Sequence, residues 1–200
     1  MKFLITVFAI FTAQLLCAGI LDDLSKASKA NPEIIMDVVQ TKNMSFFNET
    51  IQSSMTIFVS ASGKMRIQTP KPFEALSIFD GKYFARFEKS SDSWRKLDGS
   101  SGLVARRIFD EMRTLLSGSV SGASYDISKK SENTLLLIPK SDFVRKAIKS
   151  IEIATRVENG LRVVEKISIF DCDGDTTILD VKKITKAIFA PKIFDTDSPL

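Results

Sequence analysis

The chain consists largely of short runs in which apolar and polar residues alternate, and this alternation limits the possible folds most strongly. In residues 50–59, for example, the apolar residues Met55, Ile57 and Val59 follow an alternation with polar residues to which Phe58 is the exception. Alternate side chains of a strand point to opposite faces, so a period of two predicts a strand with one apolar face. The sequence therefore predicts a mainly β protein.

Turn sequences separate these runs. Ser62-Gly63, Asp80-Gly81 and Glu158-Asn159-Gly160 are typical of tight hairpin turns. Hairpins pair antiparallel strands, so we expect about ten strands in meander order, in a sheet wide enough to curl. The expected strands cover residues 50–59, 64–68, 73–79, 82–88, 93–98, 124–130, 134–138, 150–157, 161–170 and 176–181, with a further strand or edge within 184–194.

Helical signals interrupt the strands. Asn31-Pro32-Glu33 has the residues of a helix start, which predicts a helix reaching Asn43, with a shorter helical turn before it at residues 22–30. A short helical turn is also expected within residues 142–149. In the middle of the chain, apolar residues at helical spacing predict a helix that ends near Gly118. The apolar face of this helix is formed by Val104, Ile108, Met112, Leu115 and Leu116.

The first nineteen residues have the pattern of a secretory signal peptide. A positive start at Met1-Lys2 precedes an apolar run, and small residues follow at Cys17-Ala18-Gly19. A membrane span needs about 20 apolar residues, which makes an uncleaved anchor the weaker alternative. Lipid attachment at Cys17 is disfavoured because Leu16, before it, is not small. We expect cleavage after residues 1–19 and a single exported domain at residues 20–200.

The composition excludes several classes of function. The sequence has no histidine and two cysteines, which rules out Ser-His-Asp catalysis, histidine zinc sites and cysteine clusters. Its net charge of +4 is dispersed along the chain, unlike the clustered charge of nucleic-acid binders. We expect no enzyme activity, no cofactor and no nucleic-acid partner. Cys172, unpaired after cleavage, is expected to be buried.

Asp171, Asp173 and Asp175 have the spacing of a calcium-binding loop. That loop requires Gly at its sixth position and a bidentate acid at its twelfth, where this chain has Thr176 and Lys182. The pattern therefore favours an acidic hairpin turn over a metal site.

Several short motifs, taken in order, resemble the periplasmic outer-membrane lipoprotein carrier family, the LolA-like proteins. The resemblance covers nearly the whole mature chain, and its strength lies in the order of the motifs. Those motifs are Val39-Gln40 before Phe46-Phe47, Ser62-Gly63-Lys64-Met65 before Pro70-Lys71-Pro72-Phe73, Asp80-Gly81-Lys82-Tyr83-Phe84, Leu115-Leu116-Ser117-Gly118, Leu135-Leu136-Leu137-Ile138-Pro139-Lys140 and Asp173-Gly174-Asp175-Thr176-Thr177-Ile178.

The resemblance implies a mainly β fold with α: a curled antiparallel sheet that forms a half-open barrel, with an N-terminal helix and a mid-chain helix as lid. It implies a periplasmic carrier, expected to be a monomer, that binds acyl chains of lipoproteins in an apolar cavity. An inner-membrane release complex would supply the cargo and an outer-membrane acceptor would receive it. One position departs from the family, because Thr69 stands where an Arg that helps hold the lid is often found.

An acyl chain would need an apolar wall and a movable cover. Each CH₂ exposed to water costs about 0.8 kcal/mol, or on the order of 12 kcal/mol for a 16-carbon chain. An alternating strand face is more often plain core than a ligand wall, and the resemblance favours the wall. The candidate lipid-binding residues are Met55, Ile57, Val59, Met65 and Ile67 on the wall, Trp94 at the mouth, and Val104, Ile108 and Met112 on the lid.

Other functions remain open at this stage. An exported sheet module that binds a polypeptide or an envelope-stress regulator would present the same concave face. A LolA-like carrier for another lipid-linked product is a second alternative. A hydrolase without histidine is remote, since the sequence offers no convincing Ser-x-x-Lys at a helix start.

Overall fold

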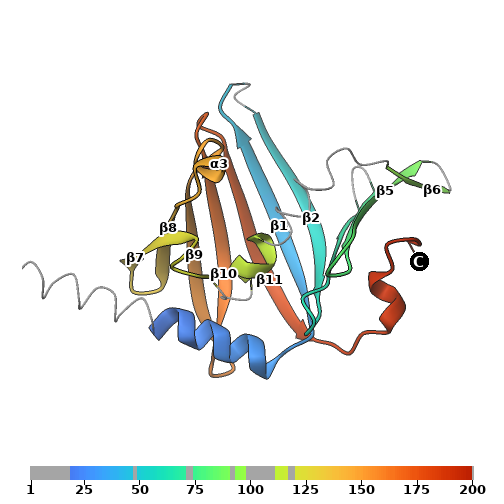
Figure 1. Cartoon of the computed structure of the whole chain (residues 1–200), viewed down its shortest axis with the longest axis horizontal. Coiled ribbons are helices and arrows are strands. Elements are labelled where there is room, and N and C mark those ends of the chain that lie inside the picture. The colour runs from blue at the N-terminus through green and yellow to red at the C-terminus, as the bar shows by residue number, and fades with distance from the viewer. Residues whose placement is uncertain are drawn as a thin grey trace, which may run out of the picture. The chain divides into compact units, whose positions relative to one another are not determined.

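A computed structural model describes residues 19–46, 49–70, 74–90, 93–97, 111–116 and 120–199. Eleven strands form one sheet in the order β6-β5-β4-β3-β2-β1-β11-β10-β9-β8-β7 (Figure 1). The strands are β1 (Ile34–Met44), β2 (Glu49–Val59), β3 (Met65–Thr69), β4 (Ala75–Phe79), β5 (Phe84–Ser90), β6 (Ser93–Lys96), β7 (Tyr125–Ser131), β8 (Thr134–Pro139), β9 (Ile148–Glu158), β10 (Leu161–Asp171) and β11 (Thr176–Lys186). Residues 19–30 and 111–116 are helical, and two short elements are α3 (Asp142–Arg145) and the 3-10 helix η1 (Pro191–Phe194).

The strand order follows the chain from β1 to β6 and again from β7 to β11, so the meander is confirmed in both runs. The two runs join where β1 neighbours β11, a pairing of distant segments that the sequence did not indicate. β6 and β7 are the outer strands of this order. The expected fold class, mainly β with an open antiparallel sheet and helices, is confirmed. Within the described residues, no helix has the length and apolar character needed to cross a membrane.

The helix expected from Asn31-Pro32-Glu33 to Asn43 is wrong, because this segment is strand β1. Met36 and Val38 are 1% and 2% exposed while Asp37 between them is exposed, which is a period of two. Branching at Cβ restricts the side chains of Ile34, Ile35, Val38 and Val39 and favours a strand. The helix lies before this segment, at residues 19–30, and is longer than the expected turn.

Other expectations differ in extent. The tail within 184–194 is divided, because β11 continues to Lys186 and η1 follows at Pro191–Phe194. The expected turn in 142–149 is confirmed as α3. The expected middle helix is seen at residues 111–116, while Val104 and Ile108 lie outside the described residues. So does the signal segment up to residue 18.

The described residues fall into two compact units. Unit 1 contains those up to Ala30 and those within Lys42–Thr50 and Leu115–Leu179. Unit 2 contains those within Asn31–Thr41, Ile51–Thr114 and Asp180–Leu200. β7–β10 therefore belong to unit 1 and β3–β6 to unit 2, whereas β1, β2 and β11 contribute residues to both.

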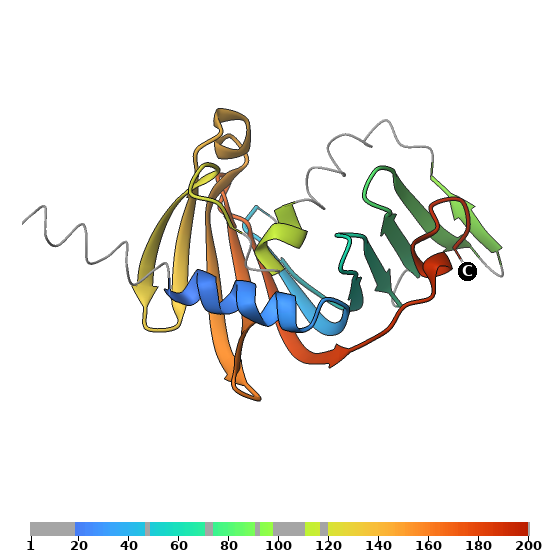
Figure 2. The same cartoon turned by 60° about the horizontal axis from the view of Figure 1, so that its bottom comes forward.

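In unit 1, the helix at residues 19–30 lies across the strands of the sheet (Figure 2). It buries Ile20, Leu24 and Ala27, whose spacing of four and three residues places them on one stripe. On the sheet, Ile153 pairs with Leu135 and Ile167, and the three side chains are at most 1% exposed. Unit 1 is thus a sheet with one apolar face and an amphipathic helix as its cover.

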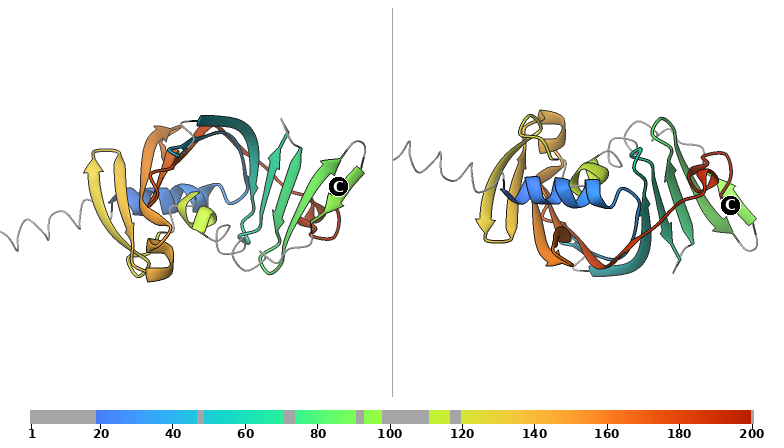
Figure 3. Two further views of the ribbon diagram at one scale, coloured as in Figure 1. Left: turned by 90° about the horizontal axis from the view of Figure 1, so that it is seen from above. Right: turned by 90° about the horizontal axis from the view of Figure 1, so that it is seen from below.

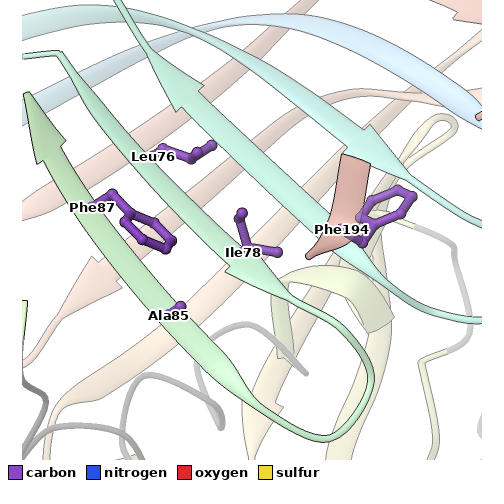
Figure 4. Packing of buried hydrophobic residues seen from close by; sticks show 5 residues of the cluster. All are labelled: Leu76, Ile78, Ala85, Phe87 and Phe194. Carbon is purple, nitrogen blue, oxygen red and sulfur yellow. The ribbon is translucent and has the colours of Figure 1, made fainter. Parts of the chain in front are cut away.

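In unit 2, the C-terminal segment packs beside β5 and β6 (Figure 3). The rings of Phe58 and Phe189, and those of Phe189 and Phe194, meet edge to face with centroids 5.9 and 5.4 Å apart. The buried cluster of unit 2 consists of Leu76, Ile78, Ala85, Phe87 and Phe194 (Figure 4). Four partly buried residues pack against it: Phe58, Trp94, Phe189 and Ile193. The tail is therefore part of the core of unit 2.

Polar contacts fix this tail. Arg66 is 7% exposed and donates hydrogen bonds to the carbonyl oxygens of Ile193 and Pro199, at 3.0 and 3.2 Å. The backbone N–H of Phe189 donates to the Glu33 carboxylate at 3.0 Å. Burial lowers the pKa of Arg66 by desolvation, so these bonds are needed to compensate a charge removed from water.

Phe194→Ala is expected to lower the free energy of unfolding of unit 2 by about 3–5 kcal/mol, through lost burial and the cavity left behind. Ile188 lies in the same tail but is 97% exposed, so Ile188→Ala should change stability by about 0.5 kcal/mol or less. Trp94 is the only tryptophan of the chain and packs against this cluster. Urea titrations followed by its fluorescence measure both variants, and equal small effects would show that the tail is not core.

Candidate functional site

The candidate site is the face of the unit 2 sheet that the C-terminal tail does not cover. The strand register shows which residues lie on it. Ile57 pairs with Ile67 and Val59 with Met65, so these four residues share one face of β2 and β3. Met55 lies on the same face, two residues from Ile57. All five residues predicted to form the wall are therefore on one face. It is opposite to the face covered by the tail, where Phe58 and Arg66 pair.

Three further residues, which were not among the predicted wall residues, extend this face. Phe79 belongs to it because it pairs with Met65. The Thr56 hydroxyl donates to the Asp37 carboxylate at 3.5 Å, which places Asp37 on the tail-covered face. Met36 and Val38 therefore lie on the other face, with Ile57. Their alternation with Asp37 could have indicated a strand, but the segment was predicted to be a helix starting at Asn31.

We call this set the acyl face: Met36, Val38, Met55, Ile57, Val59, Met65, Ile67 and Phe79. Ile57 and Met65 are 0% exposed, and Met55 is 8% exposed. Val59 and Ile67 are only half-buried. Full burial means that atoms of the chain already contact the centre of the acyl face, so its accessible part is the margin at Val59 and Ile67.

The face becomes polar toward the sheet edge. On β5, Arg86 pairs with Ser77 and Glu88 with Ala75, and Arg95 on β6 pairs with Glu88. Arg86 Nη2 lies 3.1 Å from Glu88 Oε1, and both side chains are substantially exposed. The apolar surface thus reaches β5 at Phe84, which pairs with Phe79, and a charged margin follows it along β5 and β6.

The remaining predicted residues have other positions. Trp94 pairs with Lys89 on β5 and packs against the tail-covered cluster, so it does not share the acyl face. Met112 lies on the helix at residues 111–116 and is half-buried. Side-chain atoms of Arg113, on the same helix, lie 3.3 Å from where a Cβ at Gly63 would stand, so the helix lies against the β2–β3 turn. Val104 and Ile108 are outside the described residues.

The acidic turn of unit 1 holds two segments together. The carboxylates of Asp171, Asp173 and Asp175 gather within 4.8 Å of one another. Asp175 Oδ1 accepts hydrogen bonds from the backbone N–H and hydroxyl of Ser45, at 2.9 and 3.1 Å. Its Oδ2 is 3.8 Å from Lys42 Nζ. These contacts support the predicted role as a hairpin turn.

Two adjacent residues of this turn, Asp171 and Cys172, have properties that follow from its geometry. Desolvation raises the pKa of Asp171, the charges of Asp173 and Asp175 raise it further, and Lys42 opposes them. Cys172 is free and exposed, so its expected burial is wrong. Its Sγ lies 3.2 Å from the carbonyl oxygen of Arg145.

Comparisons with known proteins match the fold rather than the sequence. No family model and no curated protein matches the sequence. A DUF1329 family protein from Desulfovibrio piger aligns with a TM-score of 0.51 and 11% identity, over 90% of this chain and 98% of its own. A LolA superfamily protein from Nitrosomonas europaea aligns with a TM-score of 0.50 and 11% identity, over 90% of this chain and 98% of its own. A putative outer membrane lipoprotein-sorting protein domain from Vibrio parahaemolyticus aligns with a TM-score of 0.48 and 8% identity, over 88% of this chain and 96% of its own.

The chain has the LolA fold. The first two alignments cover nine-tenths of this chain, so the resemblance inferred from the order of short motifs is confirmed. At 11% identity the alignments establish the fold and leave the cargo open.

Asp171→Asn is expected to raise the melting temperature at pH 7. The pKa of Asp171 is raised in the folded state, so the ionised carboxylate destabilises the fold above that pKa, and an amide removes this cost. Below the unfolded pKa, about 3.9, both states hold the proton and the gain should vanish. Thermal melts at pH 7 and pH 3.5 measure the difference, and an equal gain at both would contradict the electrostatic explanation.

Proposed function

We propose that this protein is an exported, non-enzymatic carrier that binds acyl chains on the acyl face of unit 2. The observation that carries the proposal is that the unit 2 sheet is apolar on both faces. Its own tail fills one face through Phe189, Ile193 and Phe194. The other is the acyl face, which ends at a charged margin on β5 and β6. A face of this kind suits a hydrocarbon chain attached to a polar molecule.

The side chains of the acyl face fit this role. Met36, Met55 and Met65 contribute three unbranched, flexible side chains, and such thioethers adapt to hydrocarbon chains of varied shape. The half-buried Val59 and Ile67 form the margin that a chain reaches first. Trp94 has no part in this surface, because it packs under the tail.

A bound chain would require the present cover of the acyl face to move. The helix that includes Met112 is the proposed lid, together with Val104 and Ile108 preceding it in the sequence. Replacing the lid by hydrocarbon keeps the apolar area out of water. The burial of the chain, on the order of 0.8 kcal/mol per CH₂, then drives binding.

The proposed setting is the periplasm, with acylated lipoproteins as cargo taken from the inner to the outer membrane. The LolA fold and the apolar N-terminal segment support this setting. On this proposal, an inner-membrane complex supplies the cargo and an outer-membrane acceptor removes it. A carrier of this kind would act as a monomer, since its cargo rather than a second copy occupies the acyl face.

Ile67→Glu is expected to weaken uptake of a fluorescent fatty-acid probe by about ten-fold or more, because a carboxylate on the acyl face opposes burial of hydrocarbon. Gln68→Glu is the matched control. It changes the net charge equally one residue away, but Gln68 pairs with Leu76 on the opposite face. The wild type should bind the probe stoichiometrically, as measured by fluorescence titration.

Two results would overturn this proposal. Equal probe binding by both variants would show that acyl chains bind elsewhere or that this face is solid core. Native mass spectrometry of protein extracted from membranes gives the second test. Bound acyl species are expected, whereas an empty protein with a polypeptide partner would favour the interaction module.

A further inference from the structure

Arg162 is a cation placed on the apolar face of unit 1. It lies at the start of β10 and pairs with Val157 of β9. Val164, two residues further on, is 3% exposed on the same face. Apolar strand faces seldom carry an arginine, because removing its charge from water is costly unless partners compensate.

Only part of this guanidinium has hydrogen-bond partners. Its Nη1 donates to Asn133 Oδ1 and to Thr155 Oγ1, both at 2.9 Å. Thr155 is 2% exposed, and its own hydroxyl donates to the Asn133 carbonyl oxygen at 3.0 Å. The β7–β8 turn and β9 therefore fix the orientation of Arg162 before any ligand arrives.

The Nε of Arg162 has no hydrogen-bond partner. It is buried and unpaired within the part of the chain that the structure describes. The nearest carboxylate is Asp23 Oδ2, on the helix at residues 19–30, at 3.8 Å. That distance is too long for a hydrogen bond. Asp23 is half-exposed and also lies 3.4 Å from Lys26 Nζ, so it has a second cation to pair with.

Apolar side chains lie beside Arg162 on the same face of the sheet. Val157, directly opposite Arg162, is 63% exposed. Val164 and Ile167 continue the same face, because the bulge between Val164 and Lys166 shifts the alternation by one residue. The helix with Ile20, Leu24 and Ala27 covers it. A fixed cation with an unused donor, an exposed apolar entrance and an apolar floor fit an anionic amphiphile.

We infer that Arg162 binds the carboxylate or phosphate of an amphiphile whose hydrocarbon lies under the helix at residues 19–30. The anion accepts the hydrogen bond that Nε lacks and displaces Asp23, which keeps its contact with Lys26. This site is in unit 1 and goes beyond the proposed function, which concerns the acyl face of unit 2. Neutral amphiphiles gain nothing at Arg162, so the site selects for negative charge.

The test compares a saturated fatty acid with the methyl ester of the same acid, by calorimetric titration of the full mature chain. Arg162→Gln should weaken binding of the acid by about ten- to hundred-fold, the range expected for a charged hydrogen bond, and leave the ester unchanged. Asp23→Asn should tighten binding of the acid a few-fold, because it removes the competing carboxylate, again with no change for the ester.

The same titrations separate this inference from the function proposed above. Ile67→Glu, on the acyl face, should not alter the ratio of acid to ester affinity. Arg162→Gln would overturn the inference if it weakened acid and ester equally, since Arg162 would then only hold the helix. If Arg162→Gln failed to fold, the half-exposed Asp23→Asn would still decide, and an unchanged acid affinity would refute the site. Binding of phosphatidic acid presented in vesicles, compared with binding of free fatty acid, distinguishes a phosphate from a carboxylate ligand.

Discussion

The packing of the C-terminal tail on unit 2 is the interaction on which the proposed function depends. Phe194 lies in one cluster with Ile78 and Phe87, so the chain itself completes one of the two apolar faces of this sheet. Without that cover, both apolar faces would be exposed to water, and each would need a cover of its own. The buried Arg66 adds direction to the packing, because its two bonds to backbone carbonyls allow one path for the tail.

Local sequence was enough to predict most strands, because each depends on a period of two and a turn beside it. Asn159 and Gly160, for example, both have positive φ, of 52° and 76°, as the turn between β9 and β10 requires. The error at β1 has a local cause as well. Asn31-Pro32-Glu33 is a strong helix start, and that signal outweighed the alternation of Met36 and Val38. Burial on the sheet determined the outcome, as tertiary packing often overrides local propensity.

The candidate sites were less predictable, because they depend on which strands become neighbours. The wall residues Ile57 and Ile67 were placed on one face correctly, since a hairpin fixes their register. Trp94 was predicted at the mouth of the same cavity and lies on the other face, and only the register of β5 with β6 shows that it faces the tail. Arg162 gave no signal in the sequence. Its partners Asn133 and Thr155 come from a different hairpin and a different strand, and no local pattern relates them to Asp23.

The two covers of the sheet differ in how firmly they are held, and this difference bears on function. The tail of unit 2 is fixed by three interlocked phenylalanine rings, by Arg66 and by Glu33. The helix at residues 19–30 buries only Ile20, Leu24 and the small Ala27, and Asp23 reaches Arg162 at 3.8 Å, with no hydrogen bond formed. Less buried area and weaker polar contact mean a lower free energy of local opening. The tail is therefore the fixed cover of unit 2. The helix at residues 19–30 is the cover of unit 1 that opens when an anionic amphiphile reaches Arg162, and the helix with Met112 remains the proposed lid of the acyl face.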